Sequence, residues 1–168
     1  GFGYMQSRWG YKNAQDIRAV VKGYRDSDIP LEAVFMDIDY MDDYMDFTVD
    51  SSKFPDFPDF VKEMQQDDIH LVPIIDAGVK IKEGYSVYEE GLEKSHFCTD
   101  KSQNSQAPFT AAVWPGMCHF PDFLNPEARR WFGLKYKSLL DAGIDGFWND
   151  MNEPAIFYSE DHLRDVFA

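Results

Sequence analysis

The segment Trp148 to Pro154 (WNDMNEP) holds two carboxylates, Asp150 and Glu153, three positions apart. An ionised carboxylate can attack a carbon atom as a nucleophile, and a protonated one can pass its proton to a leaving group. Either residue could therefore take part in catalysis. The spacing by itself leaves open which of them does.

The composition is that of a globular domain with an acidic balance. The 168 residues are 44% hydrophobic and 16% aromatic, and the formal net charge is −14. This length suffices for one domain with a hydrophobic core. The negative charge argues against nucleic acid, whose phosphates bind clusters of Lys and Arg. The aromatic residues suit a packed core and also a cleft that binds sugar rings.

We expect no membrane span, no metal and no cofactor. No apolar run is long enough to cross a membrane, and neither a signal peptide nor an Asn-x-Ser/Thr acceptor occurs, so the location is unknown with a weak lean to the cytoplasm. Cys98 and Cys118 form no metal-binding pattern, and both a disulfide and a reduced pair remain open. The histidines show no ligand spacing and are expected at the surface or in turns: His70, His96, His119 and His162.

Strand patterns and helix patterns alternate along the chain. Helices are expected after a cap at Asn13, over 57–64, and from the Asn-Pro-Glu start at Asn125 to about Ala142, where Gly143 ends the helix. Apolar strands are expected at 3–5, 31–39, 69–76 and 144–150. This order predicts parallel strands joined by helical crossovers.

Aspartates stand at the ends of three expected strands, at Asp37 or Asp39, at Asp76 and at Asp150. The carboxyl ends of parallel strands gather at one edge, where the active sites of open α/β sheets and of (β/α)8 barrels lie. Strand alternation predicts that Asp37 and Asp39 share one face, and that Trp148 and Asp150 share another. A single strand-end aspartate such as Asp76 more often forms a turn or a helix cap.

A long stretch, residues 80–124, is expected to form an inserted loop or subdomain within a catalytic domain that spans residues 1–168. Loops of this length are uncommon unless they serve a function. Its polar tract, residues 99–106, is interpreted as the tip of a β-hairpin whose flanks are 96–97 and 110–113.

Several catalytic classes lack their motifs in this sequence. It contains no GxGxxG, GxxxxGK[ST], HExxH, CxxC or GxSxG pattern. Carboxylates at strand ends beside tryptophan remain, and these indicate glycoside chemistry in a (β/α)8 barrel.

Two glycosidase interpretations compete for the opening segment. Asn152-Glu153-Pro154 after a fourth strand resembles the β-glycosidases in which this Glu is the acid/base. The longer run Trp148 to Glu153 resembles the W-x-D-M-N-E signature of glycoside hydrolase family 31, in which the Asp is the nucleophile. Three further elements resemble the same family and favour Asp150: residues 7–11 (SRWGY), residues 37–41 with 46–48 (DIDYM and DFT), and residues 113–116 (VWPG).

The resemblance implies a fold and a set of roles. The fold would be the N-terminal half of a (β/α)8 barrel, with about four β/α units and a long insertion after the third strand. Asp150 would be the nucleophile of a retaining hydrolysis of α-glucosides, Asp37 would bind sugar hydroxyls, and Trp9 would lie beside the sugar. Arg8 and Glu153 would be structural. The pocket would be lined by Ile38, Ile74, Trp114, Trp148 and Met151.

The resemblance also implies what the 168 residues lack. The acid/base would lie downstream, so we expect the chain alone to be inactive. Its partners would be a carbohydrate substrate and the remainder of a longer chain, which includes the second half of the barrel and an N-terminal β-sandwich. An α-xylosidase, a transglucosylase or a carbohydrate-binding pseudoenzyme remain alternatives. Linkage preference and oligomeric state are not readable from these residues.

Overall fold

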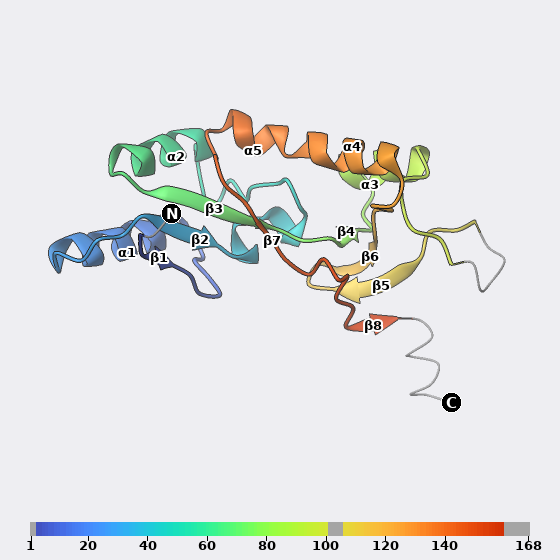
Figure 1. Cartoon of the computed structure of the whole chain (residues 1–168), viewed down its shortest axis with the longest axis horizontal. Coiled ribbons are helices and arrows are strands. Elements are labelled where there is room, and N and C mark those ends of the chain that lie inside the picture. Colours follow the sequence, from blue (N-terminus) through green and yellow to red (C-terminus); the bar gives the residue numbers. More distant parts are fainter. Residues whose placement is uncertain (1–2, 101–105, 160–168) are drawn as a thin grey trace. The chain divides into compact units, whose positions relative to one another are not determined.

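The computed structural model describes residues 3–100 and 106–159, and the chain divides into two compact units. We call the first the parallel unit; its described residues are 3–75 and 137–149. The second, the antiparallel unit, comprises 76–100, 106–136 and 150–159. Figure 1 labels the helices and strands of both units.

The parallel unit is built on a sheet of four parallel strands (Figure 1). Its order is β1 (Met5–Gln6), β2 (Ala33–Met36), β3 (His70–Ile75) and β7 (Trp148–Asn149). Helix α1 (Ala14–Asp26) connects β1 to β2, α2 (Phe57–Gln66) connects β2 to β3, and α5 (Lys137–Asp141) precedes β7. The predicted parallel β/α order is therefore confirmed.

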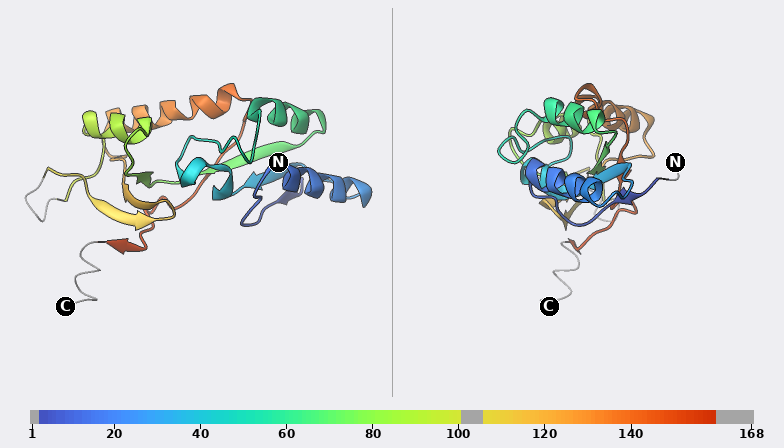
Figure 2. Two further views of the ribbon diagram at one scale, coloured as in Figure 1. Left: turned by 180° about the vertical axis from the view of Figure 1, so that it is seen from behind. Right: turned by 90° about the vertical axis from the view of Figure 1, so that its left-hand side faces the viewer.

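Local signals account for the helices of this unit. The side chain of Asn13 accepts a hydrogen bond from the backbone N–H of Asp16, so α1 begins where the cap predicts. Phe57, Phe60 and Val61 turn one apolar face of α2 into the core. Figure 2 shows both helices from two further directions.

The helix expected to run from 125 to 142 is divided in two. Helix α4 (Pro126–Lys135) and helix α5 are separated by Tyr136, and Gly143 follows with φ +100°. Only glycine adopts this conformation without strain, and a Cβ at this position would lie 3.2 Å from a methyl group of Val61.

Strand β2 is shorter than the sequence pattern predicts. It ends at Met36, and Ile38–Tyr40 form a 3-10 helix, η1, with Asp37 as its cap. The Asp37 carboxylate accepts a hydrogen bond of 2.8 Å from the N–H of Ile38, and this favours a turn over further strand. The prediction that Asp37 and Asp39 share a strand face is therefore wrong.

Strand β7 is also shorter than expected. Only Trp148 and Asn149 pair, with Ile74 and Ile75 of β3. Asp150 lies beyond the paired residues, and Met151 adopts a left-handed conformation with φ +56°. Strand alternation therefore does not set the directions of Trp148 and Asp150.

The antiparallel unit contains a second sheet of four strands. Its order is β4 (Val79–Lys80), β6 (Gly116–His119), β5 (Thr110–Val113) and β8 (Tyr158–Ser159). Helix α3 (Ser86–Glu93) and helix α4 belong to the same unit. A buried cluster of Ala111, Val113, Cys118 and Phe120 lies within this unit.

The hairpin in this unit differs from the predicted one. Strand β5 pairs with β6 through the turn at Trp114-Pro115, and not with residues 96–97. An isolated bridge joins Thr99 to Pro108, which brings the ends of the polar tract together, while residues 101–105 lie outside the described residues. The insertion at 80–124 stays a prediction.

Two of the histidines are buried. His96 and His119 are each only 8% exposed. The prediction of a surface or turn position is wrong for His119, which lies in strand β6, while His96 is buried directly after the turn at 94–95. The ring of His96 lies 5.2 Å from that of Trp131, and His119 contacts the Phe109 carbonyl. His162 lies outside the described residues.

Within residues 3–100 and 106–159, the side chains form no group of three or more potential metal ligands. Both cysteines are free thiols. None of the helices described is long and apolar enough to span a membrane.

Candidate active site

Four of the predicted site residues come from neighbouring strand ends of the parallel unit. Ile74 of β3 pairs with Trp148 of β7, and the rings of Trp148 and Phe35 are inclined at 64° with their centroids 6.1 Å apart. Ile38 and Ile74 are buried, while Asp37 and Trp148 are half-buried. The sheet thus gathers one carboxylate, two aliphatic side chains and one indole at its carboxyl edge.

Trp9 belongs to the loop that follows β1. Its side chain is 65% exposed, and its carbonyl accepts a hydrogen bond from the Arg8 guanidinium. The next carbonyl, that of Gly10, accepts a hydrogen bond of 3.3 Å from the N–H of Asp37. The loop that presents Trp9 is therefore attached directly to the backbone of Asp37.

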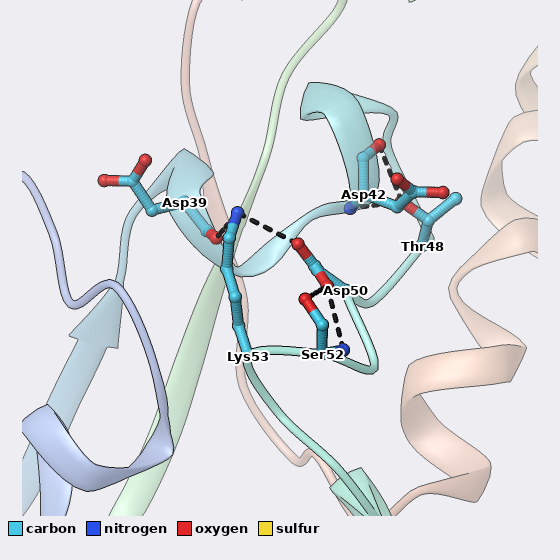
Figure 3. A network of polar contacts seen from close by, with 6 residues as sticks. All are labelled: Asp39, Asp42, Thr48, Asp50, Ser52 and Lys53. Carbon is cyan, nitrogen blue, oxygen red and sulfur yellow. Dashed lines mark hydrogen bonds and ion pairs between the residues drawn. The ribbon is translucent and has the colours of Figure 1, made fainter.

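A polar network supports the turn behind Asp37 (Figure 3). Lys53 Nζ lies 3.0 Å from Asp50 Oδ2 and donates to the Asp39 carbonyl at 3.3 Å. Figure 3 shows that the Asp39 carboxylate points away from Lys53. Hydrogen bonds from the Ser52 hydroxyl and from Lys53 lower the pKa of Asp50 to about 2, so this carboxylate stays ionised at neutral pH.

Thr48, the last residue of the DFT element, closes the neighbouring loop in Figure 3. Its hydroxyl donates to the Met45 carbonyl at 2.6 Å and accepts from the Asp42 N–H at 3.0 Å. The nearby Asp46 is 1% exposed. The DFT element therefore stabilises the loop, and the Asp46 side chain is buried within it.

Asp150 opens the last described segment of the antiparallel unit. It is half-buried and follows Asn149 directly, whereas Glu153 is exposed in the turn that comes after. Met151 packs against the buried cluster of β5 and β6, and its carbonyl accepts from the N–H of Ala155. The packing of Met151 thus fixes the backbone directly after Asp150.

Trp114 lies at the turn between β5 and β6. Its side chain is 41% exposed, and its ring meets that of Phe157 at 4.7 Å and nearly at right angles. The N–H of Phe157 donates to the Ala112 carbonyl, which fixes this pair of rings to the sheet. Exposed, fixed rings of this kind can stack on the apolar face of a sugar.

Asp76 is a candidate that the sequence interpretation set aside. It follows β3 directly, it is 6% exposed, and no helix begins behind it for it to cap. Ile75, the residue before it, pairs with Asn149, the residue before Asp150. Its strand-end position was the signal that could have identified it.

These β/α units, with carboxylates and aromatic residues at strand carboxyl ends, are of the barrel glycosidase type. The family model described as "Glycosyl hydrolases family 31 TIM-barrel domain" matches residues 1–167. The chain therefore belongs to glycoside hydrolase family 31, and its parallel unit corresponds to the N-terminal half of the (β/α)8 barrel.

Relatives and solved structures agree with this family. Alpha-glucosidase 2 of Bacillus thermoamyloliquefaciens is 41% identical over 98% of the chain, and lysosomal alpha-glucosidase of Mus musculus is 37% identical over 94%. These matches cover 20% and 17% of the two relatives, so the chain spans about a fifth of their length.

Among solved structures, the family 31 alpha-glucosidase of Bacteroides thetaiotaomicron superposes with a TM-score of 0.81 at 34% identity, covering 95% of this chain and 28% of that one. The ER glucosidase II complex gives a TM-score of 0.84 at 33% identity, covering 92% of this chain and 17% of that one.

Proposed function

We propose that the full-length protein containing this chain is a retaining α-glucosidase that releases glucose from the non-reducing ends of α-glucosides. The observation that carries the proposal is the match of residues 1–167 to the family 31 barrel domain, in which Asp150 directly follows the paired strand β7. The names of the relatives support the same activity, since several of them are alpha-glucosidases.

In the proposed reaction, Asp150 attacks the anomeric carbon while the bond to the leaving oxygen breaks. An acid elsewhere in the protein gives its proton to that oxygen, and a covalent glycosyl–Asp150 ester forms. The same group then takes a proton from water, the water attacks the anomeric carbon, and Asp150 leaves. Two carboxyl groups about 5–5.5 Å apart are needed for this double displacement.

The other predicted residues bind the sugar. Asp37 accepts hydrogen bonds from ring hydroxyls, and such bonds strengthen as positive charge develops on the ring. Trp9, exposed on the loop bonded to Asp37, lies beside the sugar. The lining comes from aliphatic, aromatic and thioether side chains, which suit the apolar faces of a pyranose: Ile38, Ile74, Trp114, Trp148 and Met151.

We place the acid/base in the part of family 31 proteins that this chain does not span. The 168 residues alone are therefore expected to be inactive toward α-glucosides. Measurable turnover by the isolated chain would mean that an acid within it, such as Glu153, completes the reaction.

The test uses the full-length protein and an aryl α-glucoside with a good leaving group. Asp150→Asn is expected to lower kcat/KM at least about 1,000-fold, whereas Glu153→Gln, the matched neutral variant, lowers it less than about 10-fold. If Glu153→Gln abolishes activity and Asp150→Asn does not, the assignment is wrong.

A second variant identifies the nucleophile by its product. Asp150→Gly opens space for azide, which would attack the face that the carboxylate has left and form a β-glucosyl azide. Rescue of Asp150→Gly by azide with this inverted product supports Asp150, whereas an α-glucosyl azide contradicts its role. Turnover of an aryl α-xyloside by the wild type, compared with that of the aryl α-glucoside, distinguishes an α-glucosidase from an α-xylosidase.

A further inference from the structure

The segment from Asp50 to Lys53 contacts two successive carbonyls of the turn that begins at Asp37. Figure 3 shows the first of these contacts, from Lys53 to Asp39. Lys53 Nζ donates to the carbonyl of Asp39 at 3.3 Å, and the N–H of Asp50 donates to the carbonyl of Tyr40 at 2.8 Å. The turn itself is closed by a bond from the Tyr40 N–H to the Asp37 carbonyl. Lys53, 14 positions after Asp39 along the chain, thus supports η1 from a separate segment.

Lys53 is held in place at both ends. Its ammonium group is 3.0 Å from Asp50 Oδ2, and Asp50 Oδ1 accepts from the Ser52 hydroxyl at 2.6 Å and from the Ser52 N–H at 2.9 Å. The Lys53 carbonyl accepts from the N–H of Ala14 at the start of α1. The following residue, Phe54, is 1% exposed and anchors the backbone in the core.

The position of the Asp37 carboxylate depends on this turn. Its Oδ1 accepts the hydrogen bond from the N–H of Ile38, the first residue of η1, so side chain and turn move together. A displaced turn would therefore displace the carboxylate. Shifts of about 1 Å at a group that positions substrate can cost up to about 100-fold in rate.

We propose that Lys53 is a positioning residue, which holds η1 through the Asp39 carbonyl and thereby fixes Asp37 for hydrogen bonding to a sugar hydroxyl. This inference rests on the proposed function, because it needs Asp37 to bind the sugar. It goes beyond it by assigning a role to Asp50, Ser52 and Lys53, which belong to none of the family elements in the sequence.

A simple surface ion pair would behave differently. The pair of Lys22 and Asp26 on α1 is solvent-exposed, with side chains 72% and 60% exposed, and it makes no bond to η1. Exposed pairs of this kind contribute little to stability. Lys22→Met therefore serves as the matched control for Lys53→Met, since each removes one ammonium group next to one carboxylate.

The experiment is a double-mutant cycle in the full-length protein with an activated aryl α-glucoside. Lys53→Met is expected to lower kcat/KM about 5- to 20-fold, mainly through kcat, whereas Lys22→Met changes it less than about 2-fold. In an Asp37→Ala background, Lys53→Met should lower kcat/KM by less than about 2-fold, because the group that it positions is gone. Lys53→Arg, which keeps a charged donor, should retain most of the activity.

The outcomes separate this inference from the proposed function. The positioning role is overturned if Lys53→Met lowers kcat/KM equally in the wild-type and Asp37→Ala backgrounds, or in neither. The proposed function stands in both cases, provided that the wild type is active. A wild type without α-glucosidase activity overturns both. If Lys53→Met does not fold, Asp50→Asn replaces it in the same cycle, since it removes the charge that holds the Lys53 ammonium.

Discussion

The hydroxyl of Tyr40 donates a hydrogen bond of 2.8 Å to the backbone carbonyl of Ile74. Tyr40 ends the turn behind β2 and is fully buried, and Ile74 lies near the end of β3, where it pairs with Trp148. One buried hydroxyl therefore connects the turn that begins at Asp37 with the strand ends that carry Ile74 and Trp148.

We predict that Tyr40→Phe destabilises the protein by about 1–2 kcal/mol, because it leaves the buried acceptor of Ile74 without this donor. Urea unfolding of the full-length protein measures the loss. Tyr44→Phe, four residues on and half-buried, is the control and should change the free energy of unfolding by less than about 0.5 kcal/mol. Equal effects of the two substitutions would argue against the importance of the Tyr40 bond.

A second prediction concerns two helical glycines of the antiparallel unit. A Cβ on Gly91 of α3 would lie 2.4 Å from Phe97 Cζ and 2.8 Å from Trp131 Cη2, whereas a Cβ on Gly133 of α4 meets nothing within 4 Å. Gly91→Ala should destabilise by about 1–3 kcal/mol through overpacking. Gly133→Ala should stabilise by about 0.5–1 kcal/mol through helix propensity. Thermal unfolding of both variants tests the opposite signs, and the same sign for both would contradict the packing of α3.

The third prediction is a pH dependence that comes from His119. Burial lowers the pKa of His119, and this effect exceeds the opposing one of the hydrogen bond to the Phe109 carbonyl. Above a pH of about 7.5, one unit above the ordinary histidine pKa of about 6.5, the imidazole is neutral in both the folded and the unfolded protein. As the pH falls below that value the unfolded protein binds the proton more readily, so stability is lost down to the folded pKa.

His119→Gln keeps a donor for the Phe109 carbonyl but does not titrate. We expect the melting temperature of the wild type to fall more steeply than that of His119→Gln between pH 7.5 and pH 5, while the difference between them stays constant above about pH 7.5. Parallel curves across the whole range would show that the buried imidazole does not drive the acid sensitivity.

Short-range signals in the sequence predicted much of the parallel unit. The Asn13 cap and the apolar spacing of Ile17 and Val21 predict α1, and the apolar run at 69–76 predicts β3, because caps and side-chain periodicity act within a few residues. The family elements also lie within short runs, so the family could be inferred without coordinates and is confirmed by the match to residues 1–167. The roles of the individual site residues stay predictions.

Bonds between distant segments decided the rest. The turn that follows β2 is held by the bond from Lys53 to the Asp39 carbonyl and by the bond from the Tyr40 hydroxyl to the Ile74 carbonyl. The antiparallel sheet pairs Val79 with His119, and burial of that histidine follows from this pairing. Such contacts join segments that lie far apart in the sequence. Caps and side-chain periodicity act within a few residues, so they do not predict these contacts. The sequence by itself therefore determined the family, helices α1 and α2 and the order of the parallel strands. Only the tertiary structure decided how the antiparallel strands pair and what holds the turn at Asp37.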